Sequence, residues 1–113
     1  MAERDRSPKS APYFAMIAEI QCLASPAGTP EDPYKHIDAA IKVVQDSGLK
    51  FEVGALGTTI EGDPDRVWAI VRAVHEACIA AGANGLVSVI KIEQTGPARV
   101  APTIASLTGK FRG

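Results

Sequence analysis

The sequence lacks the features that mark several large protein classes. The net charge of the 113 residues is −1 at pH 7, so there is no broad positive surface for nucleic acid or anionic membrane. Uncharged apolar runs fall well short of the roughly 20 residues that a membrane-spanning helix needs. The charged stretch at residues 1–10 has no apolar centre and does not fit a secretory signal. These absences lead us to expect a cytoplasmic protein that binds neither nucleic acid nor membrane.

Motifs that carry chemistry are equally scarce. The chain has two cysteines, Cys22 and Cys78, and neither shows metal-ligand spacing to His36 or His75. We expect buried reduced thiols, although a disulfide between them stays open. The sequence contains no P-loop, no dinucleotide fingerprint and no nucleophile elbow. We therefore expect no metal, no cofactor and no catalytic residue.

What is present is the composition of one globular domain. Apolar residues make up 46% and charged residues 22%, which is ordinary for a folded protein. A chain of this length buries about 65% of its unfolded surface, enough for its own core. Residues 1–12 are polar and contain Pro8 and Pro12, so we expect a flexible N-terminal arm there and a single domain over residues 13–113.

The clearest local signal lies between residues 51 and 68. Residues 51–53 and 58–61 alternate apolar and polar side chains, as half-buried strands do. The glycine-flanked turn between them predicts a β-hairpin. Asp63 and Pro64 then suit the N-cap and the first position of a helix.

The rest of the chain completes a regular pattern. The predicted elements are, in chain order, strand 13–23, a helix ending near Ser47, strands 51–53 and 58–61, helix 64–81 and strand 86–93. Thr29 or Asp32 is expected to cap the first helix, and residues 103–111 fit a short strand or a helical turn equally. The order predicts an α+β, ferredoxin-like βαββαβ sandwich: an antiparallel sheet with two helices on one face.

The sheet face away from those helices has an unusual composition. Strand alternation assigns to it Ile17, Glu19, Gln21, Glu52, Leu56, Thr59, Glu61, Val87, Val89 and Lys91. Such a face is too apolar to leave in water over a large area and too polar for a core. It favours sheet-on-sheet packing with a second subunit around a polar-lined pocket. The simpler alternative is an ordinary wet sheet face with exposed polar residues.

The motif LGTTIEGDPDRVW at residues 56–68 supports a more specific interpretation. Together with HEA at 75–77, Gly82-Ala83 and IKI at 90–92, it resembles the thiamine-binding protein family over residues 15–111. Proteins of that family are ferredoxin-like and oligomeric, and some bind thiamine or its hydroxymethylpyrimidine part. The resemblance implies a homo-oligomer, dimer or tetramer, formed through the sheet face. It also implies a carrier, buffer or sensor rather than a catalyst.

Motif position and strand alternation together select the candidate ligand-binding residues. The first choices are Glu19, Thr58, Thr59 and Glu61, and the second are Gln21 and Lys91. The pyrimidine nitrogens need carboxylate or amide partners, and the thiazolium needs nearby negative charge or an aromatic face. The alternative is an oligomeric structural or protein-interaction module without a ligand. A hydrolase or isomerase that uses Glu19 and Glu61 as acid and base is less favoured.

Overall fold

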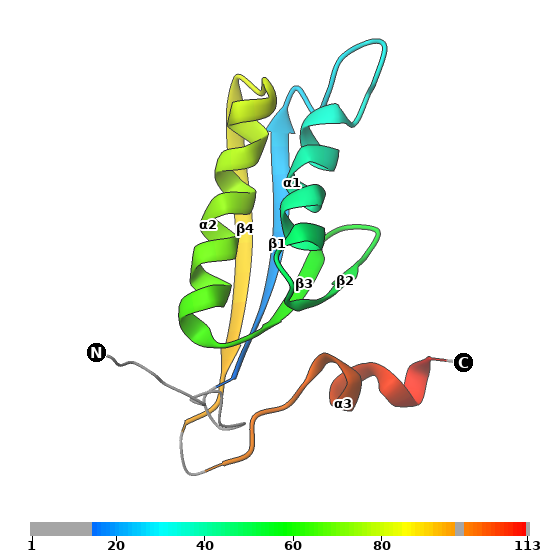
Figure 1. The fold of residues 1–113 in the computed structure, drawn as a ribbon. Coiled ribbons are helices and arrows are strands. Elements are labelled where there is room, and N and C mark those ends of the chain that lie inside the picture. Colours follow the sequence, from blue (N-terminus) through cyan, green and yellow to red (C-terminus); the bar gives the residue numbers. More distant parts are fainter. Residues whose placement is uncertain (1–14, 97–98, 113) are drawn as a thin grey trace.

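The computed structural model describes residues 15–96 and 99–112, and Figure 1 shows their fold. Over those residues the elements are β1 (Met16–Ser25), α1 (Lys35–Asp46), β2 (Lys50–Val53), β3 (Thr58–Gly62), α2 (Pro64–Ala81), β4 (Gly85–Gln94), α3 (Ile104–Thr108) and the 3₁₀ helix η3 (Gly109–Phe111). The strands form one antiparallel sheet in the order β2–β3–β1–β4, with α1 and α2 side by side on one face. The predicted ferredoxin-like α+β fold is confirmed. The predicted arm at residues 1–12 lies outside the described part.

The core lies between the sheet and these two helices. In β1, Met16, Ala18 and Ile20 point toward the helices and are buried, as strand alternation predicts. In α2, an apolar stripe that includes Val67 and Val74 packs onto them. Burying each such side chain stabilises the fold by about 1.5–3 kcal/mol. The stripe therefore fixes α2 on the sheet.

Both ends of α2 follow the sequence signals. The side chain of Asp63 accepts a hydrogen bond from the backbone N–H of Arg66 at 3.3 Å, and Pro64 occupies the first helical position. At the other end, Gly82 has a φ of 130°, a backbone conformation that side-chain-bearing residues rarely adopt. The predicted helix 64–81 is confirmed at both boundaries.

The start of α1 differs from the prediction, because neither Thr29 nor Asp32 caps it. The helix begins without a side-chain capping hydrogen bond. Instead, the backbone carbonyl of Ala27 accepts a hydrogen bond from the N–H of His36 at 2.9 Å. The hydroxyl of Thr29 accepts from the N–H of Asp32 at 3.0 Å and so stabilises a turn inside the loop. A loop carbonyl thus satisfies the first turn in place of a side chain.

The strands that flank β1 differ in length. Residues 16–25 of β1 pair with β4, whereas only residues 16–20 pair with β3. Residues 21–25 therefore have β4 on one side and, within the described chain, no strand on the other. We call this stretch the free edge of β1. It leaves room between α1 and the β2–β3 turn.

The C-terminal segment is helical, which decides the alternative left open for residues 103–111. Thr103 and Ser106 form a reciprocal capping box at the start of α3. Oε1 of Glu61 accepts a hydrogen bond from the N–H of Ile104 at 2.6 Å, and Glu52 forms an ion pair with Arg112. Both glutamates belong to the sheet face that α1 and α2 leave uncovered, which we call the open face. The C-terminal segment therefore contacts part of that face.

Candidate ligand-binding site

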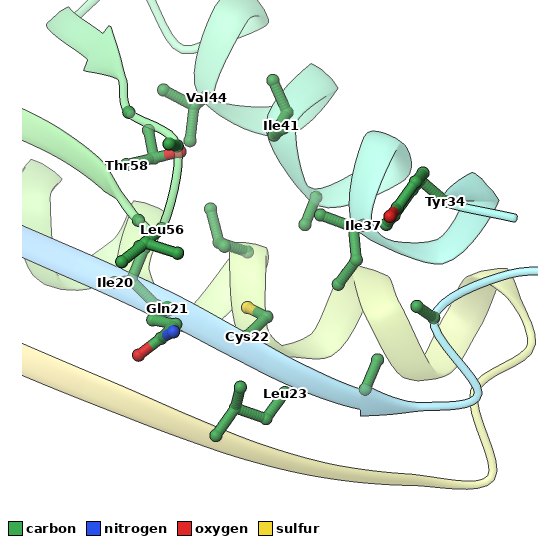
Figure 2. Close-up of a pocket in the computed structure, with 17 residues that line it drawn as sticks. Ile20, Gln21, Cys22, Leu23, Tyr34, Ile37, Ile41, Val44, Leu56 and Thr58 are labelled. Carbon is green, nitrogen blue, oxygen red and sulfur yellow. The ribbon is translucent and has the colours of Figure 1, made fainter.

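A cavity of about 370 Å³ lies along the free edge of β1 (Figure 2). One wall comes from β1, with Ile20 and Cys22, and the facing wall comes from α1, with Ile37 and Ile41. The turn at residues 54–57 borders it at one end. The volume falls in the range of roughly 300–1,000 Å³ typical of small-molecule sites. We call it the edge pocket.

The edge pocket is mainly apolar and has a few polar side chains at defined places. Gln21 and Thr58 lie near the end where Leu56 projects, and Tyr34 lies at the other end (Figure 2). Thr58 is buried, and it lies on the helix-covered side of the sheet because it pairs with Ile20. Apolar walls with a small number of polar groups suit a flat ring that carries hydrogen-bonding atoms on its edge.

A carboxylate stands beside this pocket. The side chain of Glu19 lies so close to Gly57 that a Cβ on the glycine would come within 3.3 Å of the glutamate Cγ and Cδ. Gly57 itself lines the edge pocket. Across the sheet, Nζ of Lys91 lies 3.8 Å from Oε1 of Glu19, whose side chain is 43% exposed. An exposed pair at that distance is weak, so the carboxylate can accept another cation or donor.

The structure brings five of the six predicted ligand residues together near the free edge of β1 and leaves the sixth, Glu61, apart from them. Gln21 and Thr58 line the edge pocket, and Glu19 lies beside Gly57 on its border. Thr59 and Lys91 flank Glu19 on the neighbouring strands of the open face. Glu61 stands apart from these five, because its carboxylate binds the backbone of the C-terminal segment.

A second cavity, of about 680 Å³, lies between the β2–β3 hairpin and the C-terminal segment. Its lining includes Glu52 and Glu61, both of which already have protein partners, Arg112 and the Ile104 N–H. A ligand that used these carboxylates would have to displace the contacts that hold α3. At the border of the edge pocket, Glu19 has only the weak, exposed ion pair with Lys91 at 3.8 Å, which a ligand can displace more easily.

A comparison with known protein families decides where this chain belongs. A model of the family described as "Thiamine-binding protein" matches residues 18–103, well over half of the chain. The chain belongs to the thiamine-binding protein family. That family is described by a binding activity and not by a reaction.

This chain spans most of the length of several relatives in the thiamine-binding protein family. A UPF0045 protein of Clostridium perfringens is 35% identical over 79 residues, which are 70% of this chain and 80% of the relative. The solved structure of a domain of unknown function, DUF77, from Bacillus cereus matches with a TM-score of 0.78 and 32% identity, over 90% of this chain and 94% of the other. A Thermotoga maritima protein with a proposed role in thiamine biosynthesis or salvage matches with a TM-score of 0.69 and 26% identity, over 87% and 99%.

The extent of the thiamine-binding family match separates the two cavities. Every residue that lines the edge pocket lies between 20 and 74, inside the matched range. The second cavity depends on residues 103–112, of which only residue 103 falls inside that range. A property common to the family is expected in the segment that the family shares. The edge pocket is therefore the better candidate site.

One polar cluster between α2 and the sheet was not predicted from the sequence. Nδ1 of His75 lies 2.6 Å from Oγ of Ser88, and that hydroxyl donates a hydrogen bond to Sγ of Cys22 at 3.7 Å. Burial, with a smaller contribution from the neighbouring Cys22 thiol, raises the pKa of the Cys78 thiol to about 12. Strand alternation places Cys22 and Ser88 on one face, but only the β1–β4 register shows that they are directly paired.

Two broader features bear on what the site holds. Among residues 15–96 and 99–112, the structure shows no group of three or more His, Cys, Asp or Glu side chains arranged to hold a metal ion. In the same part of the chain, no helix combines the length and apolar character required to cross a membrane. The groups that the edge pocket offers to a ligand are its apolar walls, the amide of Gln21, the hydroxyls of Thr58 and Tyr34, and the carboxylate of Glu19 at its border.

Proposed function

We propose that this protein binds thiamine or a related hydroxymethylpyrimidine compound in the edge pocket, as a carrier, buffer or sensor that performs no reaction. The observation that carries the proposal is a mainly apolar pocket, built wholly from residues that the thiamine-binding family model matches, with Glu19 beside it. The role proposed for the Thermotoga maritima relative supports the same class of ligand.

The chemistry of the pocket suits the two halves of thiamine differently. A flat aminopyrimidine fits between the apolar side chains of β1 and α1, where Thr58 offers a hydroxyl to its nitrogen atoms, and Gln21 offers an amide from the opposite side of β1 at the free edge (Figure 2). The thiazolium cation extends toward the carboxylate of Glu19. The attraction between opposite charges offsets the cost of removing both from water.

Calorimetric titration of the purified protein with thiamine, its phosphates and hydroxymethylpyrimidine tests the proposal. Gln21→Leu and Glu19→Gln are each expected to weaken thiamine binding about tenfold, the equivalent of about 1.4 kcal/mol. The matched controls are Gln45→Leu on the exposed side of α1 and Glu93→Gln on the exposed end of β4. Absence of binding heat for all of these ligands would refute the proposal. Equal weakening by the controls would place the ligand elsewhere.

We also propose that the protein forms homo-oligomers, either dimers or tetramers, through the open face. Leu23, Val87 and Val89 are 51%, 62% and 44% exposed, and the β1–β4 register makes Leu23 and Val87 direct neighbours. Contiguous exposed apolar side chains on a sheet favour packing against another protein surface. Light scattering should show a multiple of the 11.9 kDa chain, reduced in Val87→Glu. A wild-type monomer at high concentration would exclude this assembly.

A further inference from the structure

His36 is a buried polar residue that does not itself line the edge pocket. It lies in the first turn of α1 and is only 3% exposed. Nδ1 of its imidazole lies 2.7 Å from the backbone carbonyl oxygen of Pro26. Because a carbonyl oxygen only accepts hydrogen bonds, Nδ1 must carry a hydrogen and donate it. The contact therefore determines which ring nitrogen bears the hydrogen, and it ties the start of α1 to the preceding loop.

The backbone at this position holds the same loop. The N–H of residue 36 donates to the carbonyl of Ala27 at 2.9 Å, and the N–H of Ile37 donates to the same oxygen at 3.4 Å. The loop then folds closely on itself, since a Cβ on Gly28 would come within 2.2 Å of a carbonyl oxygen four residues later. Two consecutive loop carbonyls, those of residues 26 and 27, are thus bound at the start of α1.

Nε2, on the far side of the imidazole, contacts the end of α2. A Cβ on Gly82 would come within 2.9 Å of Nε2, so a side chain there would collide with the ring. The ring of His36 is therefore enclosed between the loop at residues 26–27 and the residue that ends α2. A side chain held on both sides keeps its rotamer, and the hydrogen on Nδ1 stays directed at the loop.

This loop forms part of the edge pocket. Ala27 lines the pocket beside the first turn of α1, and Tyr34 lies at the end away from Leu56 (Figure 2). We propose that His36 is a positioning residue that determines ligand size: it holds the backbone of residues 26–27, which we call the end wall, so that Ala27 closes one end of the cavity. The consequence for thiamine rests on the proposed function, whereas the closure of the pocket can be measured without thiamine.

An end wall held in advance strengthens binding, because the ligand does not have to order the loop. The apparent Kd equals the intrinsic Kd divided by the fraction of molecules whose pocket is in the binding-competent form. An end wall released from His36 spends part of its time away from the pocket. That release lowers the competent fraction and admits molecules that extend past Ala27. Loss of the side-chain hydrogen bond should therefore weaken thiamine binding and reduce discrimination by size.

The test compares His36→Asn with His36→Leu. The two side chains have nearly the same shape and both remove the ring, but only asparagine can place an N–H near the position of Nδ1. A role in filling space would make the two variants alike. We expect the Kd of thiamine, measured by titration calorimetry, to be about fivefold higher in His36→Leu than in His36→Asn. Hydrogen exchange at the amides of residues 36 and 37 should also be faster in His36→Leu.

A second measurement follows the pocket without thiamine. Cys22 lines the edge pocket, so its rates of alkylation by N-methylmaleimide and by the larger N-phenylmaleimide report how large a molecule the pocket admits. The ratio of the two rates, larger reagent over smaller, is normalised to that of the urea-unfolded chain. We expect this ratio to be several-fold higher in His36→Leu than in His36→Asn. Peptide mass spectrometry assigns the product to Cys22.

The outcomes separate this inference from the proposed function. Equal alkylation ratios in the two variants, with both folds verified by circular dichroism, would overturn the role of His36 whatever the result with thiamine. Different ratios together with no binding heat in the wild type would keep the end wall and refute the ligand. Equal thiamine affinity in two variants that bind it would also overturn the role. A measurement that needs no substitution is the ¹⁵N NMR spectrum of the wild-type imidazole. A ring whose only hydrogen is on Nε2 would contradict the proposal.

Discussion

The side chain of Glu19 lies against the backbone of Gly57, and a methyl group on that glycine would come within 3.3–3.4 Å of the Glu19 Cγ, Cδ and Oε2 atoms. Cγ belongs to the stem of the glutamate side chain, whereas Cδ and Oε2 belong to the carboxylate itself. Gly57 has no positive φ, so alanine causes no backbone strain there. The glycine thus allows a carboxylate to sit at the border of the edge pocket.

Gly57→Ala is expected to displace the Glu19 carboxylate by a few tenths of an ångström and to weaken thiamine binding several-fold. Thermal stability should change little, because the partly exposed glutamate can move aside. Gly85→Ala is the matched control, since a Cβ there meets nothing within 4 Å. Titration calorimetry and thermal melts of both variants check this. Unchanged affinity in Gly57→Ala would remove Glu19 from the site.

Thr58 and Thr59 are adjacent in sequence but point to opposite sheet faces. Substitutions at these two positions therefore show whether the ligand binds in the edge pocket or on the open face. Thr58→Val removes a hydroxyl from the pocket wall and keeps the shape of the side chain. We expect it to weaken hydroxymethylpyrimidine binding by about 1 kcal/mol, the contribution of a typical hydrogen bond. Thr59→Val should bind as the wild type does. The reverse result in titrations would move the site to the open face.

Glu61→Gln is expected to loosen the C-terminal segment without affecting the ligand. The substitution removes the negative charge that accepts the Ile104 N–H, and hydrogen bonds to charged groups contribute about 1.5–3 kcal/mol. Hydrogen exchange at the backbone amides of α3 should become faster, whereas Glu93→Gln should leave it unchanged. If Glu61→Gln weakens thiamine binding as much as Glu19→Gln does, Glu61 belongs to the ligand site after all.

Burial of Cys78 predicts a loss of stability at alkaline pH. The pKa of this thiol is about 12 in the folded protein and 9.0 for an unperturbed thiol, so above pH 9 the unfolded chain releases a proton that the folded chain retains. Stability therefore falls as pH rises between 9 and 12, by about 1 kcal/mol per pH unit. Urea unfolding in dithiothreitol at pH 8–10.5 should show the advantage of the wild type over Cys78→Ala shrinking with pH. A constant difference would contradict this.

The hairpin and α2 could be predicted because their signals are local. Asp63 and Pro64 determine the start of α2 through contacts within one turn, and the glycine-flanked turn determines the hairpin. The start of α1 could not be predicted in this way, because the capping carbonyl comes from Ala27 in the preceding loop. The helical end of the chain carries a local signal in its sequence, the Thr103–Ser106 capping box, which favours a helical turn over a strand.

The candidate site was harder to predict than the fold, because it depends on differences in strand length. Strand alternation correctly placed Glu19, Thr59 and Lys91 on one face. It could not show that β3 stops pairing at Thr58 while β1 continues to Ser25, and this difference creates the edge pocket. The pairing of Cys22 with Ser88 likewise follows from register, which one sequence does not reveal.

The free edge of β1 also affects how this fold can diversify. The pocket beside it is bordered by the turn at residues 54–57 and by Ala27 and Tyr34, which lie before α1. None of these positions belongs to the buried core of the described chain. Substitutions and changes of loop length there can therefore alter the shape of the cavity while the packing between helices and sheet is kept. The shape of the edge pocket can thus evolve, or be redesigned, largely independently of folding stability.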